Sequence, residues 1–330
     1  MNIYWKDIEN NDSSWIGLDV KIESEKSIKP NFRLEVGGKK RIKLLNQDKV
    51  IFWATLDSDY YGVYILKTFQ QLAVHEMPIS PINSKTVEEL KGLDGEEKLK
   101  QWCRVFVNKI EESNSSLFYN GRWLMSGFIN RNQKEAWKFE STANFKYFDG
   151  FINFDEADRA LKQDKLDYID WSFSGSGKLI NLKNPDINES RLKWWRKKVK
   201  EDSLPPILIW YLSCLDAYVI VDGYLRLLAS YLENRVPDFI EIHSIQEVKI
   251  SPNKKQQEQI LISLEKQRES KTISTEKLNK VLIQAFDDKP YLKRKTRAWA
   301  RIKSDEQWKH EVNNFLDSIG KTKEGEIMLM

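Results

Sequence analysis

Cysteine and histidine are scarce in this sequence. Its two cysteines in 330 residues, Cys103 and Cys214, lie far apart and belong to no motif. Two isolated cysteines exclude a disulfide framework and suit a reducing compartment. None of the three histidines (His75, His243 and His310) has a second histidine, a cysteine or an acidic residue in a persuasive metal-ligand context. The sequence therefore predicts no metal site.

Long apolar runs are missing as well. A membrane-spanning helix needs about 18 consecutive apolar residues, and the longest apolar stretch, from Pro205 to Val221, is interrupted by Asp216. The N-terminal segment MNIYWKDIENND has neither a basic start nor an apolar core, so we expect no secretory signal there. These features predict a cytoplasmic protein with no membrane partner.

A nucleotide-binding loop of the Walker A type is also absent. Such a loop reads Gly, four residues, then Gly-Lys-Ser/Thr, so that backbone amides surround a phosphate. In the segment SFSGSGK, Ser172 stands where the first glycine is needed, and Leu179 follows Lys178. We therefore interpret residues 172–178 as a loop or linker.

Charge of one sign is not in large excess, because the formal net charge is only +4. Two segments are nevertheless basic: residues 191–200 (RLKWWRKKVK) carry six positive groups, and residues 289–303 carry seven with no acid. Such segments attract phosphates or an acidic partner. The candidate contact residues are Trp194, Arg196, Lys197, Arg294, Arg297 and Trp299. The small net charge makes nucleic acid the less favoured partner.

Residues 1–80 read as β-rich. Short runs of β-branched and aromatic residues, such as NFRLEV and KVIFWATL, are separated by turn signals. Gly37-Gly38 predicts a hairpin turn. Between residues 81 and 177 we expect a helix over 96–112 and a hairpin at Asn120-Gly121 within aromatic-rich strands that include EAWKFES and FKYFDGFINF. An acidic helix over 155–165 follows.

Beyond Ile245 the sequence becomes helical. Three charged amphipathic segments, at 253–270, 274–288 and 304–320, predict three helices. Ser274 and Ser304 are suitable N-caps, and Gly320 is a suitable stop.

The most informative stretch is AYVIVDGYLRLLASYLENRVPDF, which begins at Ala217. Two buried strands, LPPILIWYL and AYVIV, precede Asp222-Gly223, and a helix from Tyr224 to Glu233 follows at once. A strand that ends in glycine at a helix N-terminus presents free amides and the positive end of the helix dipole. Arg226, one turn into the helix, is placed to hold a phosphate by two parallel hydrogen bonds.

Residues 178–247 resemble the ParB/sulfiredoxin-like superfamily, over roughly a fifth of the chain. The helix, the PPILIW strand, the DGYLRLLAS corner and the VPDFIEI strand follow the order of that family, and Gly223-x-x-Arg226-x-x-Ala229 follows its signature. The resemblance implies nucleotide binding, either ATP or CTP with magnesium, with phosphate contacts from Gly223 and Arg226. Tyr224 and Leu225 stand where the family usually has polar residues, and the sulfiredoxin cysteine is absent.

These observations predict an α+β fold of four regions. They are a β-rich N-terminal region (1–80), a mixed α/β aromatic-rich region (81–177), a ParB/sulfiredoxin-like α/β domain (178–247) and a helical C-terminal region (248–330). The candidate nucleotide or phosphate site is Asp222, Gly223, Tyr224 and Arg226.

Three functions fit this sequence. The first is a non-catalytic protein-binding protein on a degenerate ParB-like domain, comparable to bacterial immunity proteins that neutralise a toxin partner. The second is an ATP- or CTP-dependent enzyme, a phosphotransferase or NTPase, with Asp222 as base or metal ligand. The third is a ParB-like DNA-binding protein. The altered signature, the weak charge and twelve tryptophans, which often anchor interfaces, favour the first.

Overall fold

The computed structural model describes most of the chain. The described residues are 2–9, 13–38, 40–57, 61–127, 154–162, 164–171, 178–182, 188–248, 253–270, 274–286, 291–302 and 304–329. The predicted strand EAWKFES, most of FKYFDGFINF and residues 172–177 of the predicted loop lie outside the described residues.

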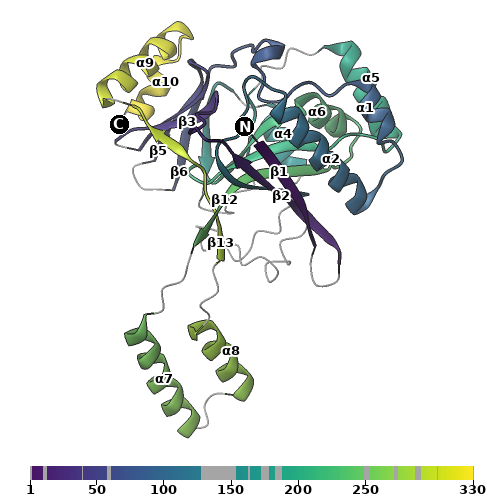
Figure 1. Ribbon diagram of the computed structural model, residues 1–330. Coiled ribbons are helices and arrows are strands. Elements are labelled where there is room, and N and C mark those ends of the chain that lie inside the picture. The colour runs from purple at the N-terminus through teal and green to yellow at the C-terminus, as the bar shows by residue number, and fades with distance from the viewer. Residues whose placement is uncertain are drawn as a thin grey trace.

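Two mixed β-sheets form the body of the protein (Figure 1). The first sheet has eight strands in the order β1-β2-β7-β12-β10-β11-β9, with β13 paired to β12 beside this path. These strands span Asn2–Glu9 (β1), Trp15–Glu23 (β2), Gly121–Gly127 (β7), Leu179–Ile180 (β9), Ile207–Leu212 (β10), Ala217–Asp222 (β11), Phe239–Val248 (β12) and Tyr291–Arg294 (β13). This sheet therefore contains strands from all four predicted regions.

The second sheet has six strands in the order β14-β3-β4-β5-β6-β8. They span Phe32–Val36 (β3), Arg41–Asn46 (β4), Lys49–Leu56 (β5), Gly62–Lys67 (β6), Leu166–Asp170 (β8) and Ala298–Ala300 (β14). The predicted turn at Gly37-Gly38 is confirmed, since β3 and β4 pair antiparallel around it, with Val36 opposite Ile42. The mixture of sheets and helices confirms the α+β class.

The helices lie around and beyond these sheets. They span Val74–Glu76 (η1), Ser84–Glu89 (α1), Gly95–Glu111 (α2), Phe154–Leu161 (α4), Glu189–Lys200 (α5), Tyr224–Leu232 (α6), Lys254–Glu269 (α7), Thr275–Phe286 (α8), Asp305–Ser318 (α9), Thr322–Gly325 (α10) and Glu326–Leu329 (η3). The predicted helices at 96–112, 155–165, 253–270, 274–288 and 304–320 are all present. Ser304 caps α9 by accepting a hydrogen bond from the backbone N–H of Gln307 at 3.0 Å.

The largest apolar core joins the inner faces of both sheets to α2 and α5. Leu18 and Trp123 contribute from the first sheet, and Phe32 and Phe52 contribute from the second. Helix α2 buries Trp102, Phe106 and Ile110, which recur at helical spacing on one face. Burial of this many large side chains is the main favourable contribution to folding.

The predicted hairpin at Asn120-Gly121 is wrong. Strand β7 begins at Gly121 and pairs with β2 and β12, and the residues immediately before it form no strand. The Asn120 side chain donates to the backbone carbonyls of Ser24 and Lys26, at 3.0 and 3.3 Å. These bonds fix the chain to the end of β2, so the dipeptide begins a strand and does not connect two.

The C-terminal region is not helical throughout, which corrects the prediction for residues 248–330. Between α8 and α9 the chain forms β13, antiparallel to β12, and β14, parallel to β3. Both strands lie between the predicted helices and are stabilised by pairing with strands from other parts of the sequence. Helix α9 packs Trp308, Val312 and Leu316 against Trp53 and Leu66 of the second sheet.

Helices α7 and α8 project from the body, as Figure 1 shows. They form an insertion between β12 and β13, whose paired ends, Val248 and Tyr291, bring the two attachment points together. We call α7 and α8 the helical projection. Leu261, Ile262 and Phe286 on it are 40%, 54% and 46% exposed.

Lys67 at the end of β6 is buried, and its side chain is 1% exposed. Burial lowers its pKa from the usual 10.5 to about 8. Between these two values the unfolded chain binds a proton that the folded protein does not, so the free energy of unfolding rises with pH across that window.

We expect Lys67→Met to remove this rise and to stabilise the protein at pH 7 by about 1–3 kcal/mol. Asp167, which lies 3.8 Å from Lys67, keeps Arg159 as a partner at 3.0 Å. Urea denaturation between pH 7 and pH 10 measures the effect as the difference between variant and wild type. Lys85→Met, at a side chain 84% exposed, is the control and leaves the profile unchanged. If the free energy of unfolding changed with pH in the same way for Lys67→Met and wild type, Lys67 would not be the source of the rise.

Candidate functional site

The strand-to-helix corner predicted at Asp222-Gly223 is present. Strand β11 ends at Asp222, Gly223 is the N-cap, and α6 begins at Tyr224. Gly223 has a φ of 112°, a left-handed conformation that side chains with a Cβ rarely adopt. The sequence folds this way because a buried β-branched strand meets a glycine and then an amphipathic run.

Arg226 contacts the protein from inside the corner. One guanidinium nitrogen donates to the Asp222 carboxylate at 2.7 Å and to the Pro206 carbonyl at 2.9 Å. The guanidinium carbon also lies 5.5 Å from the ring centroid of Trp195, and the residue is 2% exposed. A Cβ at position 223 would stand 2.9 Å from the guanidinium. Glycine is therefore needed for the close approach of Arg226 as well as for the turn.

The remaining corner residues are apolar and largely covered. Tyr224 is 7% exposed, and burial raises the pKa of its hydroxyl. Leu225 is half-buried and packs against the main core. In this arrangement one guanidinium nitrogen of Arg226 pairs with Asp222, whereas Nε of Arg226 is buried without a hydrogen-bond partner among the described residues. The corner fastens α6 to the start of β10 and to α5.

The first basic segment forms α5, and most of its charges have partners within the protein. Arg196 donates to Glu233 at 2.5 Å, and Lys197 lies 3.7 Å from Glu201. Lys198 is buried and pairs with Glu88 and Glu201. Glu88 on α1 and Glu201 at the C-terminal end of α5 offset part of the cost of burying the Lys198 charge.

Trp194 on the same helix is half-buried and contacts two neighbouring side chains. Its ring centroid lies 4.3 Å from that of Trp195, and the Lys198 ammonium lies 5.6 Å above it. The three candidates of this segment, Trp194, Arg196 and Lys197, therefore share one helix but form no continuous basic surface of unpaired groups.

The second basic segment forms β13 and β14, where its candidates contact the protein. Arg294 pairs with Glu241 at 3.2 Å. The Arg297 guanidinium lies 5.5 Å from the ring centroid of Tyr119 and 5.1 Å from that of Trp299. Trp299 is half-buried and meets Tyr119 edge-on at 5.8 Å. The structure thus brings Arg297 and Trp299 together and places Arg294 in a separate cluster.

That cluster was missed by the sequence reading. Glu241 and His243 are both buried on β12, and the Glu241 carboxylate lies 2.9 Å from Nδ1 of His243. The Arg294 guanidinium, which binds the same carboxylate, also lies 5.1 Å from the ring centroid of Tyr211. The available signal was the Glu-x-His spacing, which places both side chains on one face of a strand.

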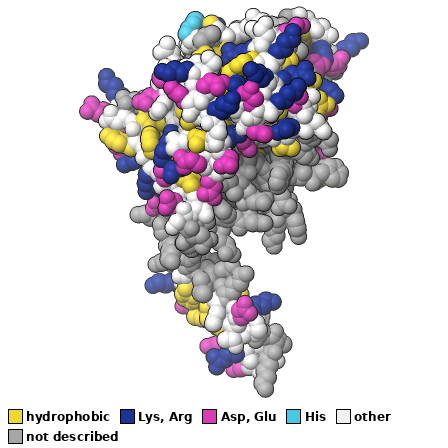
Figure 2. Space-filling view, turned by 90° about the vertical axis from the view of Figure 1, so that its right-hand side faces the viewer, with side chains coloured by type: hydrophobic (Ala, Val, Ile, Leu, Met, Phe, Trp, Pro, Cys, Tyr) yellow, Lys and Arg dark blue, Asp and Glu magenta, His cyan; other side chains and the backbone are white. Residues whose placement is uncertain are grey.

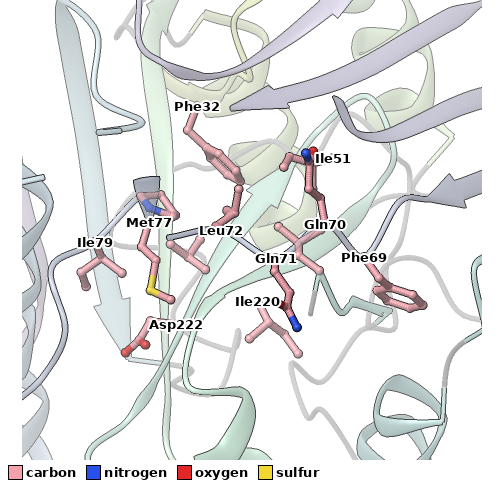
Figure 3. A pocket seen from close by; sticks show the side chains of 13 residues that line it. Phe32, Ile51, Phe69, Gln70, Gln71, Leu72, Met77, Ile79, Ile220 and Asp222 are labelled. Carbon is pink, nitrogen blue, oxygen red and sulfur yellow. The ribbon is translucent and has the colours of Figure 1, made fainter. Parts of the chain in front are cut away.

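Asp222 also lines a cavity of about 270 Å³ beside the corner, shown in Figure 3. Its walls come from the end of β11, from β3 and β5, and from the segment 69–79 that follows β6. The cavity thus lies where the two sheets meet. No lysine or arginine is present among the 13 described residues that line it.

Other kinds of site are not found within the described part of the chain. No group of three or more His, Cys, Asp or Glu is arranged there to hold a metal ion. No helix among the described residues is long and apolar enough to cross a membrane. Comparison of the chain with protein-family models, curated proteins and solved structures finds no match. The resemblance to the ParB/sulfiredoxin-like superfamily stays a prediction.

Proposed function

We propose that this chain is a non-catalytic, cytoplasmic protein-binding protein, and that the helical projection is its binding element. The observation that supports this most is the exposure of Leu261, Ile262 and Phe286 on the helical projection. Figure 2 shows hydrophobic side chains next to charged ones on the described part of this projection. Apolar groups rimmed by charged ones are typical of protein-binding surfaces.

The dimensions of the helical projection support the proposal. Helix α7 has 16 residues and α8 has 12, and two helices of this length bury little apolar surface by themselves. Docking of their apolar face into a groove of another protein would cover the exposed leucine and isoleucine. We infer that the partner presents an apolar groove with a polar rim of mixed charge, because α7 carries both signs: Lys254, Lys255, Glu258, Glu265, Lys266, Arg268 and Glu269. A bacterial toxin is a partner class that fits this proposal by analogy.

The nucleotide-dependent alternative is less well supported. It requires Arg226 to bind phosphate, whereas Arg226 pairs with Asp222 beneath Gly223. The DNA-binding alternative requires unpaired basic groups, whereas Arg196, Lys198 and Arg294 are paired with acids of the same chain.

The double variant Leu261→Asp/Ile262→Asp tests the proposal. We expect the wild-type chain, used as bait in the cells that encode it, to retain one partner in stoichiometric amounts. The double variant should retain it at least about 30-fold less well, because two buried charges would have no partner in the interface. The measurement is quantitative mass spectrometry of the retained proteins, followed by a binding titration with the purified partner.

Val236→Asp is the matched control, because Val236 is 62% exposed on the body of the protein. It should retain the partner as the wild type does. Equal retention by all three proteins would contradict the proposal. A wild-type dimer and a monomeric double variant in light scattering would show that the projection binds a second copy of this chain, which would also overturn it.

A further inference from the structure

The cavity beside Asp222 is lined mostly by apolar side chains and by a few polar ones. Phe32, Ile51 and Ile79, which are at most 3% exposed, are among the apolar ones. Gln70, Gln71 and Asp222 supply the polar groups, and Figure 3 shows Asp222 near Met77 and the Gln71 side chain extending toward Ile220. An apolar interior with a few polar groups is the usual composition of a small-molecule site.

The wall formed by residues 69–79 is fixed at both ends. The Thr68 hydroxyl donates to the Val50 carbonyl at 3.0 Å, and the Ser80 amide donates to the Lys109 carbonyl of α2 at 3.0 Å. Between these points Phe69 has a φ of 48°, a left-handed conformation that is rare for an aromatic residue. Strained backbone of this kind concentrates at functional sites. The cavity is therefore bounded on this side by a segment that is anchored at both ends.

We propose that this cavity binds a small, mostly apolar molecule whose polar end donates hydrogen bonds, such as an amine or an alcohol. The volume of about 270 Å³ is close to the lower end, about 300 Å³, of typical ligand pockets. Asp222 is the one charged residue among the 13 described lining residues, and a carboxylate accepts hydrogen bonds. Arg226 holds that carboxylate in place from below and does not line the cavity.

The same arrangement selects against anions. Arg226 already pairs with the Asp222 carboxylate from outside the cavity. No lysine or arginine is present among the described lining residues, so a carboxylate or phosphate group inside the cavity would lose its hydration without gaining a cationic partner. The site therefore differs in chemistry from a nucleotide site, although it adjoins the strand-to-helix corner. It also lies on the body of the protein and is separate from the helical projection.

Benzylamine, benzyl alcohol and benzoate form a matched set of probes, because they share a ring and differ in the polar end. Ligand-observed NMR titration of the full chain is expected to give a Kd of about 1 mM for the amine and the alcohol. Benzoate should bind at least about tenfold more weakly. Absence of saturable binding of the amine, or equal affinity for benzoate, would overturn the proposal.

Two variants locate the binding. Leu72→Trp fills the cavity from a half-buried position and should weaken benzylamine binding at least about tenfold. Leu232→Trp, at an exposed position at the far end of α6, is the control and should not change it. Unchanged affinity in a folded Leu72→Trp protein would place the probe elsewhere and overturn the proposal.

Asp222→Asn provides a readout that does not depend on filling the cavity. Asparagine keeps an acceptor for Arg226 but adds a donor and removes the charge. The preference for benzylamine over benzoate should fall to less than about threefold. If the preference for benzylamine over benzoate were unchanged, Asp222 would not contact the polar end of the ligand, and the proposed ligand class would be overturned.

Discussion

Replacing Arg226 with alanine is expected to lower the free energy of unfolding by about 2–4 kcal/mol. The guanidinium is buried, binds Asp222 and the Pro206 carbonyl, and packs near the Trp195 ring. Its removal takes one hydrogen bond from the Pro206 carbonyl and one from the Asp222 carboxylate, and it opens space between α5 and α6. Breaking a fully buried ion pair costs about 3–5 kcal/mol. We expect a somewhat smaller loss here because the Asp222 side chain is 23% exposed and is accessible to water. Urea denaturation at pH 7 measures the change.

A double-mutant cycle with Asp222→Ala assigns the loss to the pair. We expect a coupling energy of about 1–3 kcal/mol between the two positions, since they share one short charged hydrogen bond. A loss below about 0.5 kcal/mol for Arg226→Ala, which is ordinary for surface substitutions, would show that the guanidinium is not structural. The corner would then be open to another role.

Arg41→Ala is expected to cost about 3–5 kcal/mol, the largest effect predicted here. Arg41 is 1% exposed and fastens the C-terminal helices to the second sheet. It donates to Asp305 at 2.8 Å, to the Thr55 hydroxyl at 2.8 Å and to the Met328 carbonyl at 2.7 Å. Its guanidinium carbon also lies 4.5 Å from the Trp308 ring centroid. Thermal and urea unfolding both report this loss.

Lys309→Ala is the matched control for Arg41, because Lys309 pairs with the same Asp305 at 3.3 Å but is 36% exposed. Exposed ion pairs contribute little, so we expect a change of about 0.5 kcal/mol or less. If both variants lost the same free energy of unfolding, burial and multiple hydrogen bonds would not explain the large contribution expected of Arg41.

Local patterns in the sequence predicted the secondary structure well where one periodicity dominates. The strands of residues 1–80, the apolar face of α2 and the Ser304 cap follow from alternation, helical spacing and cap chemistry. Strands β13 and β14 were missed because each is short and exists by pairing with a distant strand. The Asn120-Gly121 prediction failed for the same reason, since β7 pairs with β2 and β12 and not with its own neighbour in sequence.

In the candidate site, too, some features follow from the local sequence and others depend on residues distant in sequence. The turn at Asp222-Gly223 follows from local sequence, whereas the direction of Arg226 depends on Pro206 and Trp195. The cavity combines residues from β3, β5, the segment 69–79 and β11, so no single stretch of sequence carries its signal. The pairing of Arg294 with Glu241 likewise depends on the register of β12 and β13.

We propose that this chain acts by binding another protein and not by nucleotide chemistry at the corner. Titration of the wild-type chain with ATP and with CTP, each with magnesium, tests it directly through the melting temperature. We predict a flat response with both nucleotides. A ligand at 100 times its Kd adds about 2.7 kcal/mol of stability, so a saturable rise in melting temperature that is lost in Arg226→Lys would contradict the claim.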